Sequence, residues 1–258
     1  MPSKSRSSSF KVRIDLSYDG TRFAGWQRQK NARSIQETLE QTFHKILGER
    51  IRVIAAGRTD SGVHAQGQVA HATLHSLIQP AALHRALNAL LPEEILIQSL
   101  KVVGKDFHAR YGAKAKRYRY TIWNCPLRPL WNRHQVLHVP APLDSRKMRS
   151  AARLLVGRHD FGPFHSSGRV VSSTIRHLRS LTIRQKKETI LIEAEADGFL
   201  YHMVRRMVGL LLEIGKGRYS PSTVRTLLSR AEKPASDRRQ IIPPTAPAKG
   251  LCLVEVRY

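Results

Sequence analysis

One order of sequence patterns occurs twice in the chain, and this repetition constrains the fold more than any other feature. Apolar and polar side chains alternate over residues 10–17, which is the period of a half-buried strand. Ser34 and Glu37 then form a capping box, the usual start of an amphipathic helix. The segments that follow are expected to be strands at 51–56 and 68–77, a helix at 80–91 and a strand at 95–103. The first half therefore has the order β-α-β-β-α-β.

The second half repeats this order with different residues. Strands are expected at 116–123, 174–185, 188–196 and 251–258, and helices at 144–156 and 200–214. An extra short helix that begins near Ser220 and a proline-rich loop precede the last strand. Two copies of the order predict an α+β protein made of two ferredoxin-like units. Side by side, these units would form a central mixed or antiparallel sheet with a cleft, and clefts between units are common binding places.

The boundary between the units is expected in the polar segment 104–112, which a glycine punctuates at each end. The prediction is an N-terminal ferredoxin-like unit over residues 10–108 and a C-terminal one over 109–258. Residues 1–9 are basic and rich in serine, and they lack the apolar core of a secretory signal. We therefore expect a flexible basic tail on a cytoplasmic protein.

The charge of the chain is strongly unbalanced. Lys and Arg number 44 against 19 Asp and Glu, which gives a formal net charge of +25. Such a charge informs us about partners rather than fold. Nucleic acid is the usual partner, because basic side chains displace the counterions of its phosphates. A membrane surface is the competing polyanion, but no apolar stretch approaches the ~20 residues that span a bilayer.

Several classes of site are absent from the sequence. Cys125 and Cys252 form no CxxC pair, which argues against a disulfide framework or a cysteine-rich zinc site. No GxxxxGK[ST] loop occurs and no GxGxxG follows a strand, so no nucleotide cofactor is expected. The histidines form no HExxH motif, and Ser61 lacks the GxSxG elbow of a serine hydrolase. The sequence therefore predicts neither a metal nor an organic cofactor.

The stretch GRTDSGVHA, residues 57–65, places Asp60 in a polar turn directly after an apolar run. Asp followed closely by Gly is ordinary turn chemistry, because Asp bonds its own backbone and Gly tolerates positive φ. A carboxylate held beside Arg58 could equally be kept for chemistry. The stretch alone leaves both interpretations open.

The strand expected at 116–123 separates aromatic from basic side chains. Tyr118 and Tyr120 point to one face, and Arg117 and Arg119 to the other. Periodicity favours an aromatic core face and a solvated basic face. The alternative is a basic wall for phosphates beside an aromatic ring that stacks on a base.

The helix expected at 200–214 is apolar over most of its surface, but Arg205 and Arg206 interrupt it. A basic residue in so apolar a helix must reach water by snorkelling or meet an anion. For Arg206 we expect snorkelling, whereas Arg205 could do either.

Five segments, in order along the chain, together resemble the tRNA pseudouridine synthase A family. They are YDGTRFAGWQRQ (18–29), GRTDSGVHAQGQVAH (57–71), DFHARYGAKAKRYRY (106–120), GFLYHMVRRMVG (198–209) and TAPAKGLCLVEVRY (245–258). The resemblance implies an isomerase that converts uridine to pseudouridine in the anticodon stem-loop of tRNA, at positions 38, 39 and 40, without metal or cofactor. It also implies a homodimer that binds tRNA across both subunits, and two ferredoxin-like units that share a central sheet.

The resemblance assigns roles to residues by motif position. Asp60 is the catalytic carboxylate, acting as nucleophile, which makes the N-terminal unit the catalytic one. Arg58 orients Asp60, and Arg205 faces it. Tyr118 packs against the target base and assists proton removal from C5. The residues expected to bind the substrate are Tyr118, Lys116, Arg117 and Arg110.

Two positions depart from the family pattern. Ser61 stands where many members have alanine, and His165 where a larger basic residue is expected. The alternative function is a non-catalytic RNA-binding or tRNA-remodelling protein of the same fold, which the charge would equally support. Against it, the chain has no RNP1 run, and a pure binder has no evident use for Asp60 among basic residues.

Overall fold

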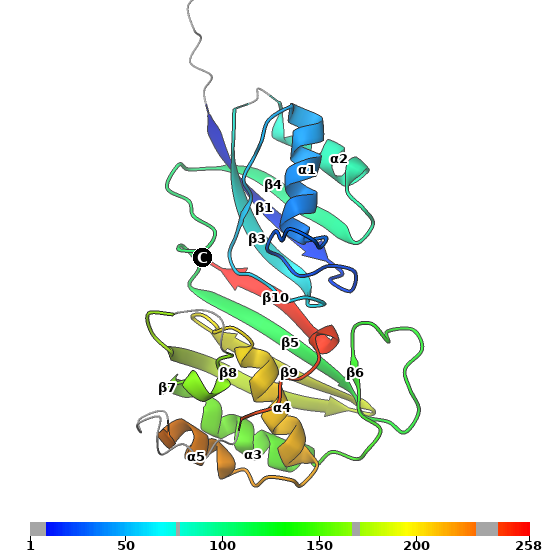
Figure 1. Cartoon of the computed structure of the whole chain (residues 1–258), viewed down its shortest axis with the longest axis vertical. Helices are drawn as coiled ribbons and strands as arrows, with labels where there is room; N and C mark the ends of the chain where they lie inside the picture. Colours follow the sequence, from blue (N-terminus) through cyan, green and yellow to red (C-terminus); the bar gives the residue numbers. More distant parts are fainter. Residues whose placement is uncertain (1–8, 76–77, 167–170, 231–241) are drawn as a thin grey trace, which may run out of the picture. The chain divides into compact units, whose positions relative to one another are not determined.

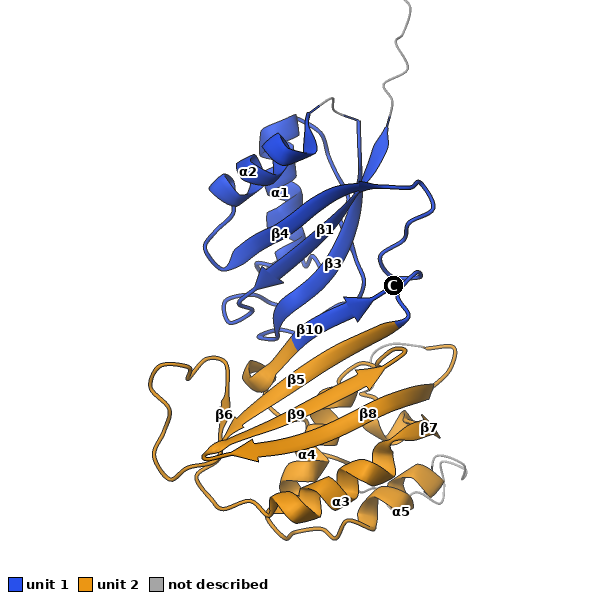
Figure 2. Cartoon of the chain, turned by 180° about the vertical axis from the view of Figure 1, so that it is seen from behind, with its two compact units in different colours: residues 1–114, 253–258 blue, residues 115–252 orange. Residues whose placement is uncertain are grey.

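The structure is a computed structural model that describes residues 9–75, 78–166, 171–230 and 242–258. The predicted flexible tail falls almost wholly on residues 1–8, outside the described residues. The chain forms two compact units (Figure 2). Unit 1 runs up to Lys114 and includes Leu253–Tyr258, and unit 2 is Ala115–Cys252. The sequence places the boundary near residue 108 and keeps the last strand in the second unit.

Unit 1 has the predicted order of elements. They are β1 (Phe10–Tyr18), α1 (Ile35–Leu47), β2 (Ile54–Ala55), β3 (His64–Leu74), α2 (Pro80–Leu90) and β4 (Ile95–Val103). The strands lie in the order β4-β1-β3, β2 pairs with β3, and β10 (Leu251–Arg257) follows β3. Pairing is antiparallel between β1 and both of its neighbours and between β2 and β3. Both helices cover one face of this sheet (Figure 1). This arrangement is the ferredoxin-like order β-α-β-β-α-β.

Local chemistry explains α1, whereas burial explains where the strand predictions were wrong. The Ser34 side chain accepts a hydrogen bond from the backbone of Glu37, and α1 ends at Gly48 with φ 69°. β3 begins at His64, four residues earlier than predicted, because the missed residues 64–67 include a buried histidine and a glycine. His64 is only 6% exposed. β2 covers only two of the six residues predicted as a strand. The apolar run 51–56 is mostly buried, but burial alone does not make a segment pair with a neighbouring strand.

Unit 2 repeats the order β-α-β-β-α with two additional short strands and one additional helix, whereas the last strand of the order, β10, lies mostly in unit 1. Its elements are β5 (Ala115–Trp123), β6 (Leu137–His138), α3 (Ser145–Leu155), β7 (Gly157–Asp160), β8 (Ile175–Lys186), β9 (Thr189–Ala196), α4 (Met203–Gly215) and α5 (Thr223–Arg230). The strands lie in the order β5-β9-β8-β7, and β6 pairs parallel with β5. The helices lie behind the sheet in Figure 2. Among the described residues, the two units together thus hold five α-helices and ten mostly antiparallel strands, which confirms the predicted α+β class.

Two details of unit 2 differ from the sequence prediction. The short strands β6 and β7 were not predicted, because two and four residues are too few to show a period. The helix predicted from residue 200 begins at Met203, since His202 has a left-handed backbone with φ 63°. A non-glycine residue in that conformation cannot continue a right-handed helix.

Candidate active site

Asp60 lies in unit 1 on the loop between β2 and β3, which we call the Asp60 loop (residues 57–63). Its side chain is partly exposed, Arg58 is exposed, and Thr59 between them is buried. The backbone N–H of Val63 donates to the carbonyl oxygen of Asp60 at 3.1 Å, and Gly62 has φ 76°. These are the features of a tight turn whose third residue needs positive φ. Turn chemistry therefore holds at Asp60, and the residue remains partly exposed.

The Asp60 loop is bound by the segment that follows β1. The backbone N–H of Trp26 donates to the carbonyl of Thr59 at 3.0 Å. The carbonyl of Phe23 accepts two bonds, from the Gly62 backbone at 3.2 Å and from the Ser61 hydroxyl at 3.3 Å. These bonds are spread over the turn, so its backbone is held on both sides of Asp60.

Two glycines allow the two segments to touch through their backbones. Gly25 has φ 93°, and a Cβ added there would lie 2.5 Å from the carbonyl oxygen of Thr59. A Cβ on Gly20 would lie 2.0 Å from the carbonyl oxygen of Val63. Real Cβ atoms do not approach backbone this closely, so any side chain at either position would push the Asp60 loop away. The contact explains why the motifs at 18–29 and 57–71 occur together.

A buried polar network lies beneath the same loop. The hydroxyls of Tyr18 and Thr59 lie 2.8 Å apart. The Gln68 amide donates to the carbonyl of Gly57 at 2.8 Å and to the Tyr18 hydroxyl at 3.3 Å. A buried polar group left unpaired costs about 1–3 kcal/mol, so this network favours one position of the loop. Sequence reasoning missed Tyr18 and Gln68, and the only signal was a polar residue at an inward position of β3.

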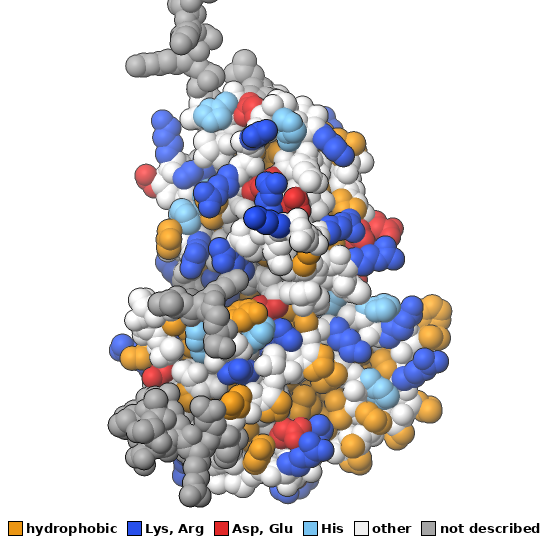
Figure 3. Space-filling model, viewed as in Figure 1, with side chains coloured by type: hydrophobic (Ala, Val, Ile, Leu, Met, Phe, Trp, Pro, Cys, Tyr) orange, Lys and Arg blue, Asp and Glu red, His pale blue; other side chains and the backbone are white. Residues whose placement is uncertain are grey.

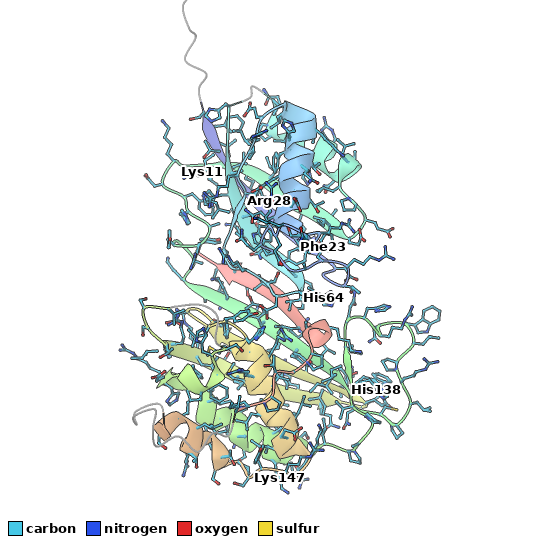
Figure 4. All side chains as sticks on the ribbon, viewed as in Figure 1. Lys11, Phe23, Arg28, His64, His138 and Lys147 are labelled. Carbon is cyan, nitrogen blue, oxygen red and sulfur yellow. The ribbon has the colours of Figure 1, made fainter. Side chains whose placement is uncertain are left out.

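His64 links the end of the Asp60 loop to the residues after β1. Its Nδ1 lies 3.1 Å from the backbone nitrogen of Gly20 and 3.1 Å from a carboxylate oxygen of Asp19. His64 is 6% exposed, and it is labelled with Phe23 in Figure 4. Both ends of the loop are therefore anchored, the start through Gln68 and the end through His64.

Tyr118 belongs to unit 2 and lies in β5. Its side chain is 7% exposed, and its ring meets Phe199 edge-on, with ring centres 5.2 Å apart and planes at 90°. Tyr120 and Ile122 on the same face have no exposed surface, which confirms the predicted aromatic core face. Burial raises the pKa of Tyr120, whose hydroxyl donates to the carbonyl of Pro247 at 2.7 Å.

On the opposite face of β5, acidic side chains of the neighbouring strand lie beside the arginines. Arg117 on this face is partly exposed, as is Lys116, which lies on the same face as Tyr118. Arg119 forms an ion pair with Glu193 of β9 at 2.9 Å, and Arg117 lies opposite Glu195 in the register of the two strands. Acidic partners thus accompany the arginines of this strand, and the face is not a uniform wall for phosphates.

Arg205 lies in the first turns of α4 and binds the segment before β10. Its Nε donates to the carbonyl of Ala246 at 2.8 Å, and the backbone of Ala246 donates back to the carbonyl of Arg205 at 3.0 Å. Since Tyr120 binds the adjacent carbonyl of Pro247, the segment joins α4 to β5. The positive charge of Arg205 partly opposes the rise in the pKa of Tyr120. Unit 2 therefore brings Arg205 to the aromatic face that carries Tyr118.

Arg206 differs from its predicted behaviour. We expected it to snorkel to water, but its guanidinium donates to the carbonyl of His165 at 2.7 Å and its Nε is buried. Burial lowers the pKa of Arg206, and burial followed by the charge of Arg206 lowers the pKa of His165. The snorkelling prediction was wrong because a loop carbonyl takes the place of water.

Arg110, the remaining predicted substrate-binding residue, is exposed in unit 1 after β4. Its guanidinium carbon lies 5.7 Å from the ring centre of Tyr111, which is 79% exposed. The backbone N–H groups of both residues donate to Nδ1 of His108, at 3.2 and 3.1 Å. The structure thus places Arg58, Asp60 and Arg110 in unit 1, and Lys116, Arg117, Tyr118 and Arg205 in unit 2.

Two other kinds of site are absent from the described ranges. No group of three His, Cys, Asp or Glu side chains there could hold a metal ion. In the same part of the chain, no helix has both the length and the apolar character that crossing a bilayer requires.

Comparison with known proteins shows the family of this chain. The profile of a family described as tRNA pseudouridine synthase matches residues 16–112 and 151–258. A protein of Acetivibrio thermocellus named tRNA pseudouridine synthase A is 40% identical over 247 residues, which cover 96% of this chain and 99% of the relative. Proteins of the same name from Syntrophotalea carbinolica and Chlamydia trachomatis are 43% and 44% identical. The alignments cover 96% of this chain, and 96% and 92% of those relatives.

Proposed function

Because the chain belongs to the family of tRNA pseudouridine synthases, we propose that it converts uridine to pseudouridine in tRNA, at positions 38, 39 and 40 of the anticodon stem-loop. The relatives match over almost their whole length, so the likeness extends to every element that carries a predicted site residue. The net charge of +25 supports a polyanionic substrate. The reaction is an isomerisation, and it needs no redox partner.

The atoms of this reaction balance within the nucleotide. The Asp60 carboxylate attacks C1′ of the sugar as the nucleophile, and the bond between N1 of uracil and C1′ breaks with its electron pair on the base. The base turns in the site, and C5 attacks C1′ while the bond between Asp60 and C1′ breaks, which frees the carboxylate. The proton on C5 then leaves, and N1 takes up a proton. One observation carries the assignment of Asp60: its turn is fixed by backbone bonds and a buried network while its side chain stays partly exposed. A catalytic group must be both positioned and reachable.

The other predicted residues have supporting roles in the proposal. Arg58, two positions away on the same exposed turn, orients the carboxylate. Tyr118 packs against the target base and assists removal of the C5 proton. A base taken out of a stem costs a few kcal/mol, and contact with an aromatic ring offsets part of this cost. Arg205 faces the reacting carboxylate, and its bond to Ala246 fixes the orientation of the guanidinium.

Substrate binding and assembly complete the proposal. Lys116, Arg117 and Arg110 contact the phosphates around the target nucleotide, and each of them is partly or fully exposed. We also propose that the protein acts in the cytoplasm as a homodimer that binds tRNA across both subunits. Sedimentation equilibrium tests the assembly, because a monomer at all concentrations would contradict it.

The experiment that tests the function is tritium release from tRNA labelled at uridine C5. The wild-type protein should release tritium, and Asp60→Asn should not, while its affinity for tRNA stays within about twofold because binding rests on phosphate contacts. Asp106→Asn is the matched control, since it removes the same charge from an exposed position of unit 1. Tight tRNA binding without release by the wild type would instead support a non-catalytic RNA-binding protein.

A further inference from the structure

The connection between β5 and β6, which we call the β5–β6 loop (residues 124–136), exposes large apolar side chains. Trp131 is 93% exposed, Leu127 77% and Leu130 61%. Large side chains grouped in this way on a surface mark a binding site more often than scattered ones do. Trp131 is the most exposed of the large apolar side chains that the structure describes, and neither the core nor the proposed active site uses it.

The β5–β6 loop is held in place despite its exposure. The Trp123 indole donates to the carbonyl of Leu127 at 2.8 Å, and the Arg133 guanidinium donates to the carbonyl of Leu130 at 3.1 Å. At its base, the Asn124 amide donates to two carbonyls beyond β6, at 2.8 and 2.7 Å. Pro126 and Pro129 further restrict its backbone. An ordered loop loses little conformational freedom when a partner binds to it.

The surroundings of Trp131 are basic. Arg128 and Arg133 flank it, and no Asp or Glu occurs between positions 124 and 143. Figure 3 shows basic and hydrophobic side chains mixed at the right of unit 2, the side on which the β5–β6 loop lies in Figure 1. The same loop of a second copy would bring basic side chains against these basic side chains, whereas the phosphates of RNA are attracted to them. Charge therefore favours a nucleic acid over a copy of the chain as the occupant.

We propose that the β5–β6 loop is an RNA-binding platform, in which Trp131 stacks on an unpaired base and Arg128 and Arg133 bind the adjacent phosphates. Aromatic rings in basic surroundings bind single-stranded bases in this way. That the RNA is tRNA rests on the proposed function. The loop lies within residues 113–150, which the family profile leaves unmatched.

Affinity measurements test the stacking. Trp131→Ala should weaken binding of tRNA about 5- to 150-fold, the loss that removal of one base–aromatic stack produces. Trp131→Phe should restore most of the affinity, because a phenyl ring also stacks. Leu90→Ala, at an apolar position that is 56% exposed in α2, is the matched control and should leave the affinity unchanged. Full affinity in Trp131→Ala would overturn the proposal.

Fluorescence separates base stacking from simple charge attraction. Of the three tryptophans, Trp26 is 2% exposed, Trp123 is partly exposed and Trp131 is 93% exposed, so binding at the surface should act mainly on Trp131. We expect tRNA to quench the tryptophan emission and heparin, a polyanion without bases, to leave it unchanged. Quenching that persists in Trp131→Phe, or that heparin reproduces, would overturn the proposal.

Two further readouts exclude a protein partner and keep the inference separate from the proposed function. Leu130→Ala should leave tRNA affinity within about twofold, because phosphate and base contacts carry the binding. Loss of self-association in Leu130→Ala or Trp131→Ala would make the loop an interface between copies instead. Turnover of saturating tRNA by Trp131→Ala should equal that of the wild type. A wild type that binds and quenches without tritium release would overturn the function and keep the platform.

Discussion

The Asp60 loop and the β5–β6 loop both connect strands and both expose a side chain, yet they are held in different ways. The Asp60 loop is fixed by backbone contacts at Gly25 and by the buried side chain of Gln68. The β5–β6 loop is anchored mainly at its base, through Asn124, and extends apolar side chains to the solvent. Chemistry requires a group held within a fraction of an ångström, whereas recognition requires an accessible surface. Changes to the first loop should therefore affect turnover, and changes to the second should affect affinity.

The largest effect is expected from Gly25→Ala. Its new Cβ would meet the carbonyl of Thr59 at 2.5 Å, so the Asp60 loop must move. A displacement of about 1 Å at a reacting group can reduce kcat about 100-fold. The matched control is Gly48→Ala, where φ is also positive at 69° but no atom lies within 4 Å. Tritium release at saturating tRNA checks both variants, and equal losses would show that backbone strain alone decides the result.

Gln68→Leu should destabilise the same loop from beneath. Removing the amide leaves the carbonyl of Gly57 without its bond from Gln68. The free energy of unfolding in urea should fall by about 1–3 kcal/mol, and kcat should fall with it. Gln98→Leu makes the same change at an exposed position of β4 and should cost less than about 0.5 kcal/mol. A Gln68→Leu protein with wild-type turnover would mean that the network does not position Asp60.

Stability of unit 1 should depend on pH through His71. Burial, and next the charges of His108 and Lys11, lower the pKa of His71 from 6.5 to about 4 in the folded chain. Between these two values the unfolded chain binds a proton that the folded chain does not. Stability should therefore rise as pH increases from 4 to 6.5 and fall as pH decreases through that range. His71→Gln should flatten the profile in urea unfolding, whereas His44→Gln, at an exposed position, should not. Equal slopes in both variants would exclude His71 as the cause.

The smallest effect is expected at the base of the β5–β6 loop. Asn124→Ala removes the amide bonds to Val139 and Ala141 and should cost about 1 kcal/mol of stability. Affinity for tRNA should fall a fewfold because the loop is less ordered, and turnover at saturating tRNA should not change. Asn132→Ala, an exposed change in the same loop, should alter neither. A fall in turnover without a fall in affinity would contradict the claim that this loop acts on binding and not on the reaction.

Local patterns predicted much of the fold because they arise within a few residues. The sequence predicted β4 at its observed bounds, alternation predicted β1 to within a residue of its end, and the capping box predicted the start of α1. A buried histidine hid the start of β3, since hydropathy predicts that His64 is exposed. The short strands β6 and β7 have too few residues to show a period.

In the candidate site, too, local features could be predicted from the sequence and long-range contacts could not. The motif at 57–65 pointed to Asp60 because a turn and its polar residues are local. The bond between Gln68 and Gly57 joins residues eleven positions apart, and the contact between Gly25 and Thr59 joins two separate motifs. Such pairings depend on how the strands lie together, which no single segment specifies. The exposure of Trp131 likewise follows from packing, because a tryptophan in a sequence indicates a core position first.

A single-turnover experiment with enzyme in excess tests the central claim most directly. The rate of tritium release from C5-labelled tRNA and the Kd for the same tRNA would be measured for the wild type, Asp60→Asn and Trp131→Ala. We predict that Asp60→Asn loses the rate and keeps the Kd, and that Trp131→Ala keeps the rate at saturation and loses affinity. Measurable release by Asp60→Asn at the wild-type rate would contradict the account, because the carboxylate would then have no part in the reaction.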